Sequence, residues 1–167
     1  QERVNLEVLR GVAEGASDIG ITAGPIKAQG LEVIHFRTDR LVVATHQAHP
    51  LAAQAALTLE DTLAYPHICL QEASSLLRFL KNQVDALQRE LNVRIQVFGF
   101  ESMCRMIEAG VGIGIMPQSA ALRYQQTMGL NIIELHEPWA VRERSIVVRD
   151  AQALPEYVKT LIQLLIQ

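Results

Sequence analysis

The stretch Ser102-Met-Cys-Arg-Met-Ile-Glu-Ala-Gly-Val-Gly-Ile-Gly-Ile-Met-Pro117 decides the fold class, because it predicts a helix followed at once by a strand. Residues 102–109 have the apolar spacing of a short helix, and Gly110 is a typical residue for a helix C-terminus. Residues 111–116 form an apolar run that is typical of a buried strand. Strand and helix alternate in the same way on both sides. The alternation predicts an α/β protein with mixed, mostly parallel sheets.

The glycines of this stretch resemble part of a dinucleotide-binding loop. In that loop the glycines follow a strand and lead into a helix, whereas Gly110, Gly112 and Gly114 precede and occupy a strand, so the context excludes it. We expect Gly112 and Gly114 to permit close packing of backbone, or its approach to a cleft.

Periodicity and turn residues extend the pattern over the whole chain. Further helices are predicted at 5–14, from Thr58 to before Pro66, at 76–91, 120–128 and 155–166, and further strands at 18–22, 31–36, 40–45, 67–70, 94–100, 130–135 and 144–149. The strands 31–36 and 40–45 follow each other without a proper turn. They therefore predict one extended crossing between two sheets.

A second extended crossing is expected at Glu137-Pro138-Trp139. Two crossings predict two lobes, the first discontinuous and built from residues 1–37 and 137–167, the second from 38–136. A hinge and a cleft between the lobes would follow from this layout. Trp139, the single tryptophan, is expected to pack over the hinge or the interface between the lobes.

Composition excludes some functions. With a net charge of −3 and a pI near 6.0, the chain lacks the dense basic surface that a protein needs to grip nucleic acid by itself. Arg142, Glu143, Arg144 and Arg149 are interpreted as a solvated face of a strand. No apolar run reaches the roughly 20 residues of a membrane span, so we expect no membrane partner.

Catalytic and metal-binding patterns are also missing from the sequence. His46 and His49 have no third ligand at a suitable spacing, and the sequence has no G-x-S-x-G nucleophile motif. We therefore expect no metal, no cofactor and no enzymatic activity. Cys69 and Cys104 are expected to be buried free thiols, with a disulfide or redox switch left open as the alternative.

Three motifs, in this order, resemble the effector-binding domains of LysR-type transcriptional regulators. They are Gly15-Ala-Ser-Asp18-Ile-Gly-Ile21, His49-Pro-Leu-Ala52 and Ala109-Gly-Val-Gly-Ile-Gly-Ile-Met-Pro117. The resemblance covers nearly the whole chain. It implies a two-lobed, type 2 periplasmic-binding-protein-like fold with a small-molecule effector in the interlobe cleft.

The chain departs from the family pattern at its start. The first strand and helix of the first lobe are absent, and so is the N-terminal DNA-binding domain. The chain begins Gln1-Glu2-Arg3 without an initiator methionine, and we expect it to be a fragment of a longer protein.

In such a fold, helix N-termini can line the effector site, because their free backbone N–H groups and positive dipole end favour anions. Ser74 and Ser75 are predicted to open the helix at 76–91, and Glu101 and Ser102 to open the next helix. Two interpretations of the serines stay open, ligand contact and simple helix capping, and they are compatible with each other.

Three more candidates complete the predicted effector site. Thr45, at the end of its strand, matches a position where the family often has a polar residue in contact with the effector. Thr22 and Ala23 follow the strand of the first lobe and are expected to face the same cleft.

The predicted function is that of an effector-binding and oligomerisation domain of a cytoplasmic LysR-type regulator, for a small anionic metabolite. We expect a homodimer, with a homotetramer possible for the full-length protein, and DNA contact only through the absent N-terminal domain. The apolar faces of the helices at 5–14 and 76–91 are candidates for the dimer interface, or alternatively part of the core. The alternative function is that of a solute-binding protein that delivers a ligand to a transporter.

Overall fold

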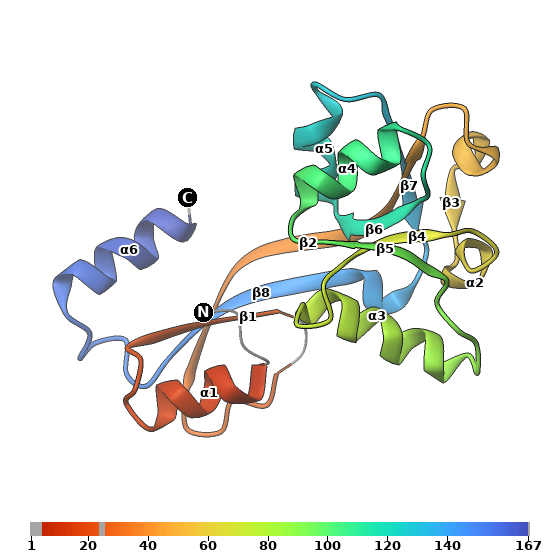
Figure 1. Ribbon diagram of the computed structural model, residues 1–167. Helices are drawn as coiled ribbons and strands as arrows, with labels where there is room; N and C mark the ends of the chain where they lie inside the picture. Colours follow the sequence, from red (N-terminus) through yellow and green to blue (C-terminus); the bar gives the residue numbers. More distant parts are fainter. Residues whose placement is uncertain (1–4, 24–25, 167) are drawn as a thin grey trace. The chain divides into compact units, whose positions relative to one another are not determined.

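The computed structural model describes residues 5–23 and 26–166 (Figure 1). The chain forms two compact units: unit 1 comprises Gln1–Asp39 and Val141–Gln167, and unit 2 comprises Arg40–Ala140. The changes between units thus lie within a few residues of the predicted lobe boundaries at 37/38 and 136/137. The assignment of the lobes as domains stays a prediction.

Unit 1 is a small sheet with a helix on each face. Its elements are α1 (Asn5–Ala13), β1 (Ile19–Ala23), the first part of β2 (Glu32–His46), β8 (Val141–Val148) and α6 (Glu156–Ile166). The strand order is β1-β8-β2, and β1 runs antiparallel to β8. Ile146 and Val148 pack with Val158 and Ile162 of α6, whereas Val147, which points to the other face, lies beside α1.

Unit 2 is a larger α/β unit. Its elements are the rest of β2, η1 (Pro50–Ala53), β3 (Ala56–Leu57), α2 (Leu59–Thr62), β4 (His67–Leu70), α3 (Ser75–Ala86), β5 (Val93–Val97), α4 (Phe100–Glu108), β6 (Gly114–Pro117), α5 (Gln118–Gln125), β7 (Leu130–Leu135) and η2 (Pro138–Ala140). Helix α3 packs on one face of its strands, and α4 and α5 pack on the other (Figure 1).

The α/β class and the mixed sheet are confirmed, but parallel strand pairs do not dominate. Strand β2 pairs antiparallel with both β6 and β7, and β1 with β8. The parallel pairs are β3 with β7 and β4 with β5. In unit 2, β2 lies between β6 and β7, and both of these strands run in the direction opposite to β2.

The predicted strands 31–36 and 40–45 form one continuous strand, the 15-residue β2. Its first half is exposed or half-buried, and its second half, Leu41 to Thr45, is buried on both faces. This change matches the passage of the chain from unit 1 into the core of unit 2 at Arg40. The predicted extended crossing is therefore a strand that belongs to both units.

The core of unit 2 has two layers. The buried side chains of α3 face Leu41 and Val43 of β2, whereas Val42 and Ala44 face α4 and α5. The apolar stripe of α3 is Leu76, Leu77, Leu80 and Val84, all at most 7% exposed. This stripe is therefore part of the core, which is the second of the two roles predicted for it.

The ends of the helices partly agree with their predicted positions. Helix α3 ends at Ala86, before Gln88, which has a positive φ of 55°, so Leu91 lies outside the helix although it still packs on the core. Gly15 and Gly110 follow α1 and α4 with φ values of 76° and 72°, and the helix C-terminus predicted at Gly110 is confirmed. Helix α2 begins with a capping box, in which the side chains of Thr58 and Asp61 each accept a hydrogen bond from the other residue's backbone N–H.

Gly112 and Gly114 permit close packing, as expected. A Cβ atom at position 112 would lie 2.5 Å from the backbone carbonyl oxygen of Pro66, and one at 114 would lie 2.7 Å from Cδ1 of Ile107. The Pro66 oxygen cannot move freely, because it accepts a hydrogen bond of 2.9 Å from the backbone N–H of Ile113. Gly112 is therefore required where the backbone before β4 meets the start of β6.

We expect Gly112→Ala to lower the free energy of unfolding by about 1–3 kcal/mol, because the added methyl group would overlap fixed backbone. Urea denaturation measures this change. Gly129→Ala is the matched control, since a Cβ there meets only ordinary contacts at 3.8 Å. Equal stability of the two variants would contradict the packing argument.

Candidate functional site

Three helices of unit 2 begin at one edge of its strands. Strands β4 and β5 are parallel, and their last residues, Leu70 and Val97, are paired. Strand β6 runs in the same direction, as the parallel bridge of His67 to Ile113 shows. Helices α3, α4 and α5 follow these three strands. We call this edge, residues 71–75, 98–102 and 117–119, the helix-start edge.

The N-terminus of α3 presents both predicted serines. Ser74 is the N-cap, and its hydroxyl accepts a hydrogen bond of 3.2 Å from the backbone N–H of Leu76. Ser75 is the first helical residue and is exposed. Capping by Ser74 is thus shown, whereas contact of either serine with a ligand stays a prediction.

Helix α4 begins two residues before its predicted start. Its first residue is Phe100 and its N-cap is Gly99, which has no side chain to cap the backbone N–H groups of the first turn. Glu101 and Ser102 therefore lie inside the first turn, where both are exposed. Gly99 could not be recognised from sequence, because a glycine N-cap has no hydroxyl or carboxylate that marks a helix start.

Glu72 fixes the loop between β4 and α3. Its carboxylate accepts hydrogen bonds from Gln96 of β5 at 2.9 Å and from Lys81 of α3 at 2.7 Å. These two bonds lower the pKa of Glu72 below its ordinary value. The loop that carries the predicted serines is therefore tied to its neighbours on two sides.

Thr45 does not lie with the helix starts of unit 2. In the β2–β6 register Leu41 pairs with Pro117 at the helix-start edge, and Ala44 pairs with Gly114 at the opposite end. Thr45 lies one residue further, roughly 13 Å along the strand from Leu41. It is fully buried, and its hydroxyl donates to the backbone oxygen of His46 at 3.1 Å.

Thr22 and Ala23 lie together at the end of β1 in unit 1. Thr22 is 2% exposed, and its hydroxyl donates to the backbone oxygen of Ser145 at 3.3 Å. Ala23 is half-buried and pairs with Arg144 of β8. Of the two predicted residues, Ala23 is thus the one that borders a charged side chain.

Arg142 and Arg144, expected to belong to a solvated face of a strand, lie beside an acidic residue. Arg142 is half-buried, and burial together with the charge of Arg144 lowers its pKa, against an opposing effect of Asp39. Arg144 lies 3.9 Å from the carboxylate of Asp39. Asp39 is far away in the sequence, so only the pairing of β1, β8 and β2 reveals this cluster.

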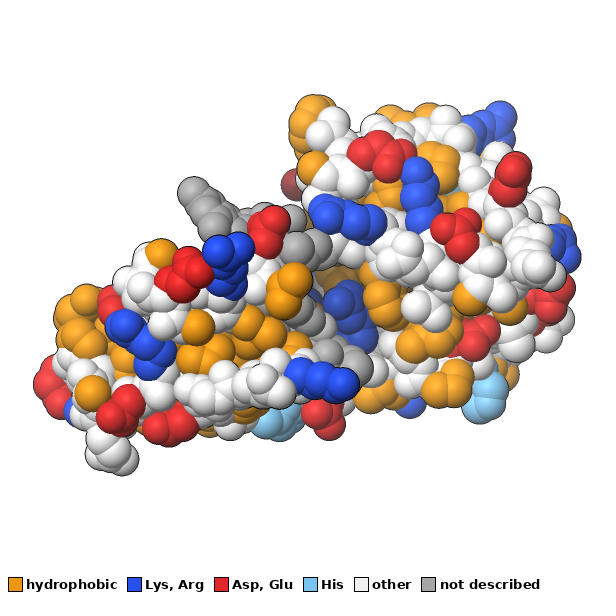
Figure 2. All heavy atoms as spheres, turned by 90° about the horizontal axis from the view of Figure 1, so that it is seen from below, with side chains coloured by type: hydrophobic (Ala, Val, Ile, Leu, Met, Phe, Trp, Pro, Cys, Tyr) orange, Lys and Arg blue, Asp and Glu red, His pale blue; other side chains and the backbone are white. Residues whose placement is uncertain are grey.

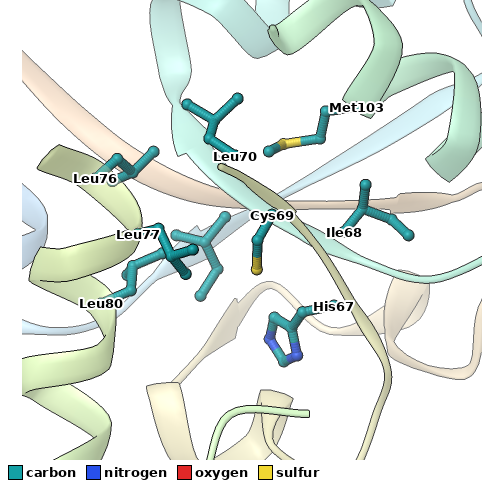
Figure 3. A pocket seen from close by; sticks show the side chains of 9 residues that line it. His67, Ile68, Cys69, Leu70, Leu76, Leu77, Leu80 and Met103 are labelled. Carbon is teal, nitrogen blue, oxygen red and sulfur yellow. The ribbon is translucent and has the colours of Figure 1, made fainter. Parts of the chain in front are cut away.

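A small apolar cavity lies between α3, β4 and α4. Figure 3 shows side chains that line it, among them Leu76, Leu77 and Leu80 of α3 and Met103 of α4. Its volume of about 10 Å³ corresponds to about one water molecule. Ligand pockets are larger by more than an order of magnitude. This cavity is a gap in the core and is not the effector site.

His67 also borders this cavity and is buried as a neutral side chain. Its Nδ1 lies 3.0 Å from the carbonyl oxygen of Tyr65, which only accepts, so the ring donates there. Its Nε2 lies 3.3 Å from the hydroxyl of Thr62. Burial lowers the pKa of His67 to about 4. His67 therefore joins α2 to β4 and is a structural histidine.

Both cysteines are buried and free, as predicted. Burial raises the pKa of each thiol to about 11. Ile68 shares the α4-side core with Cys104, and Cys69, the next residue along β4, points to the opposite face. The two thiols thus lie on different faces of the same strands, so a disulfide between them would require refolding of unit 2.

His46 and His49 shape the turn after β2. Their Nδ1 atoms accept hydrogen bonds from the backbone N–H groups of Ala48 at 3.1 Å and Leu51 at 3.2 Å. Within residues 5–23 and 26–166, no three His, Cys, Asp or Glu side chains are grouped to hold a metal ion.

The surface and the helices bear on the expectations about nucleic acid and membranes. Lys and Arg side chains are interspersed with Asp and Glu on the face shown in Figure 2, without an extended basic area. None of the helices in the described part of the chain has the length and apolar character for crossing a membrane.

Trp139 packs edge-on against Phe79 of α3, at 5.5 Å between ring centroids, within unit 2.

Comparison with known proteins gives relatives that are transcription regulators. One is a "Probable nitrogen assimilation transcriptional activator" of Synechococcus elongatus, 24% identical over 150 residues, with 88% of this chain and 48% of the relative covered. Another is the transcriptional activator protein LysR of Escherichia coli, 27% identical over 107 residues, with 64% and 34% covered. The chain thus spans half or less of the length of these relatives.

Solved structures show the same fold. The effector-binding domain of QuiR in complex with shikimate has a TM-score of 0.71 at 18% identity, covering 98% of this chain and 77% of that one. The regulatory domain of Synechocystis CcmR in complex with 2-PG has a TM-score of 0.77 at 18% identity, with 98% and 78% covered.

The fold is therefore the two-lobed, periplasmic-binding-protein-like fold of regulator effector-binding domains, which confirms the predicted fold class. The family model described as the LysR substrate binding domain matches residues 1–167, and the chain belongs to this family. The resemblance seen in the three sequence motifs is confirmed.

We expect acid to destabilise the protein through His67. Its pKa is about 4 in the fold and about 6.5 in the unfolded chain, so between these values the unfolded chain binds the proton. Stability is thus lost as the pH falls below about 6.5, and this residue contributes a loss of about 2 kcal/mol between pH 7 and pH 5.

Urea denaturation at several pH values measures this effect. His67→Gln should show a smaller loss between pH 7 and pH 5 than the wild type. His136→Gln is the control, because the His136 side chain is 79% exposed. An unchanged pH dependence in His67→Gln would show that His67 does not remain neutral in the fold.

Proposed function

We propose that this chain is the effector-binding part of a LysR-type transcription regulator and that it binds a small, anionic metabolite. The observation that carries the proposal is the helix-start edge of a LysR-family domain, where α3, α4 and α5 begin side by side. In the whole regulator, effector binding would reposition DNA-binding domains in the cytoplasm. This requires that the effector binds one arrangement of the protein more tightly than the other.

The chemistry of the helix-start edge supports an anionic ligand. The first backbone N–H groups of a helix have no partner within the helix, and the positive end of the helix dipole adds to their attraction for anions. Gly99 leaves those of α4 without a side-chain cap. Two structural neighbours are complexes with shikimate and with 2-PG, which supports binding of small molecules.

Ser75 and Ser102 are the residues of this edge that we propose to contact the effector. Both hydroxyls are exposed, and neither residue is the N-cap of its helix. Ser74, Glu101, Thr22 and Ala23 stay secondary candidates. The buried position of Thr45 at the opposite end of β2 gives it no such support.

We expect a thermal-shift screen of small carboxylates, aromatic acids and amino-acid derivatives to find a stabilising compound. A ligand at about 100 times its Kd adds about 2.7 kcal/mol of stability, which raises the Tm by several degrees. For that compound, Ser75→Ala and Ser102→Ala should each weaken binding by roughly fivefold, the value of one neutral hydrogen bond.

Ser17→Ala is the matched control, because Ser17 is an exposed serine of unit 1. The unliganded Tm of all three variants should stay close to that of the wild type. A panel without any stabilising compound would contradict effector binding by this chain, and wild-type affinity in both variants would contradict the proposed contacts.

We also propose that the protein forms a homodimer. Helix α6 carries apolar side chains on two sides: Val158 and Ile162 are buried, whereas Tyr157, Leu161 and Leu164 are 71%, 44% and 65% exposed. Their spacing of four and three residues places the exposed three on one stripe. An exposed apolar stripe on a helix is typical of an interaction surface.

Sedimentation at micromolar concentration should show a dimer, and Leu161→Glu should shift it toward monomer by placing a charge in the apolar stripe. Gln163→Glu introduces the same charge at an exposed position of α6 outside the stripe, and should leave the dimer intact. A wild-type monomer would contradict the dimer, and a dimer in Leu161→Glu would place the interface elsewhere.

A further inference from the structure

Arg78 is a charged side chain at the start of α3 that the contacts proposed so far do not use. It is the fourth residue of this helix, and it is exposed. Its guanidinium group donates to the backbone oxygen of Ala73 at 3.2 Å, in the loop before the helix. The side chain therefore runs back toward the N-terminus of its own helix, as long helical side chains usually do. Arg78 thus adds a full positive charge to the helix-start edge beside Ser74 and Ser75.

The charge of Arg78 is not neutralised by a carboxylate. Glu72 is the acidic residue closest to it in the sequence, but the Glu72 carboxylate accepts from Lys81 at 2.7 Å and from Gln96 at 2.9 Å. In the described part of the chain, the Arg78 side chain has its hydrogen bond to the Ala73 oxygen and no ion pair. A guanidinium group has five N–H donors, so most of those of Arg78 are left for a ligand.

The same turn of α3 has further donors. The N–H of Leu76 donates to the Ser74 hydroxyl, and the N–H of Arg78 donates to the Ser74 backbone oxygen at 3.2 Å. The N–H groups of Ser75 and Leu77 have no partner among the residues that the structure describes. Ser75 also has an exposed hydroxyl. One turn of helix thus combines a cation with neutral donors, which a helix N-terminus alone does not provide.

The other charges of the helix-start edge favour a ligand with a single negative charge. The segments that define this edge contain no Lys, Arg or His. Lys81 lies nearby, but its charge is opposed by that of Glu72. Glu101, in the first turn of α4, is exposed and has no cationic partner among the described residues. Its carboxylate would repel a second negative charge on the ligand. One planar carboxylate matches the paired donors of one guanidinium group.

We propose that Arg78 is the specificity-determining residue of the helix-start edge and that it binds the carboxylate group of a monocarboxylate effector. Ser75 donates to the same carboxylate from the first turn of α3. Helix α4, where Glu101 lies beside Ser102, then contacts a neutral polar part of the effector. The proposal rests on the proposed effector-binding function and names the chemical class of the effector.

NMR of the isotope-labelled protein tests this assignment with acetate as the probe, at an ionic strength held constant with chloride. The backbone amides of Ser75 and Leu77 and the Nε–H of Arg78 should shift with one common Kd. Arg78→Gln should raise the Kd for acetate by roughly tenfold or more. Inorganic phosphate, at a pH where it is mainly a dianion, should bind more weakly than acetate.

Arg123→Gln is the matched control, because Arg123 is an exposed arginine in the last turn of α5 and the substitution removes the same charge away from the helix-start edge. Arg78→Lys keeps the charge but not the paired donors, and should raise the Kd for acetate by a smaller factor than Arg78→Gln. Glu101→Gln should strengthen the binding of phosphate more than that of acetate, since it removes the charge that repels a dianion.

Three results would overturn the assignment: no acetate-dependent shifts at the start of α3, wild-type affinity for acetate in Arg78→Gln, or tighter binding of phosphate than of acetate by the wild type. None of them contradicts the proposed function, because an effector found in the metabolite screen could still bind the helix-start edge through other groups. Conversely, acetate binding that is weakened in Arg78→Gln but not in Arg123→Gln would support the assignment even if that screen found no effector.

Discussion

Two backbone hydrogen bonds between the start of β4 and the residue before β6 set the arrangement of unit 2. The N–H of Ile68 donates to the oxygen of Ile113 at 2.8 Å, and the N–H of Ile113 donates to the oxygen of Pro66 at 2.9 Å. They require the backbones to approach so closely that position 112 has no room for a side chain. With β4, β5 and β6 parallel, the helices that follow them begin at a common edge. The chemistry that we propose for that edge thus depends on a contact at the other end of the strands.

Much of the fold could be predicted from sequence because local signals agree with it. The apolar stripe from Leu76 to Val84, the capping box at Thr58 and Asp61 and the glycines after α1 and α4 all act within a few residues of chain. The predictions that failed depend on distant contacts. Strand β2 is continuous, and its second half lies in the core of unit 2. There it pairs with β6 and β7, which come much later in the chain, and both pairs are antiparallel.

The candidate site was less predictable than the fold for the same reason. Ser74 has a local cap signal, and the structure has it at a helix start. Thr45 was predicted from its position at the end of an apolar strand. The strand register places it at the end of β2 that lies away from the helix starts. Arg142 and Arg144 are read as surface residues in a sequence with few basic clusters. In the folded chain, the sheet of unit 1 places Asp39 close to both arginines, and this contact cannot be seen in the sequence.

The two buried thiols of unit 2 can report local opening of the protein, because each reacts only when it is exposed. Cys69 of β4 lies under α3, whereas Cys104 belongs to α4 and faces the strands, and burial keeps both thiols protonated. Alkylation of a thiol therefore requires local separation of α3 from the strands at Cys69, or of α4 from the strands at Cys104. The rate at each cysteine would measure how often one helix layer lifts independently of the other. A molecule that binds the helix-start edge would slow alkylation of both thiols. The two rates would then report its effect on α3 and on α4 separately.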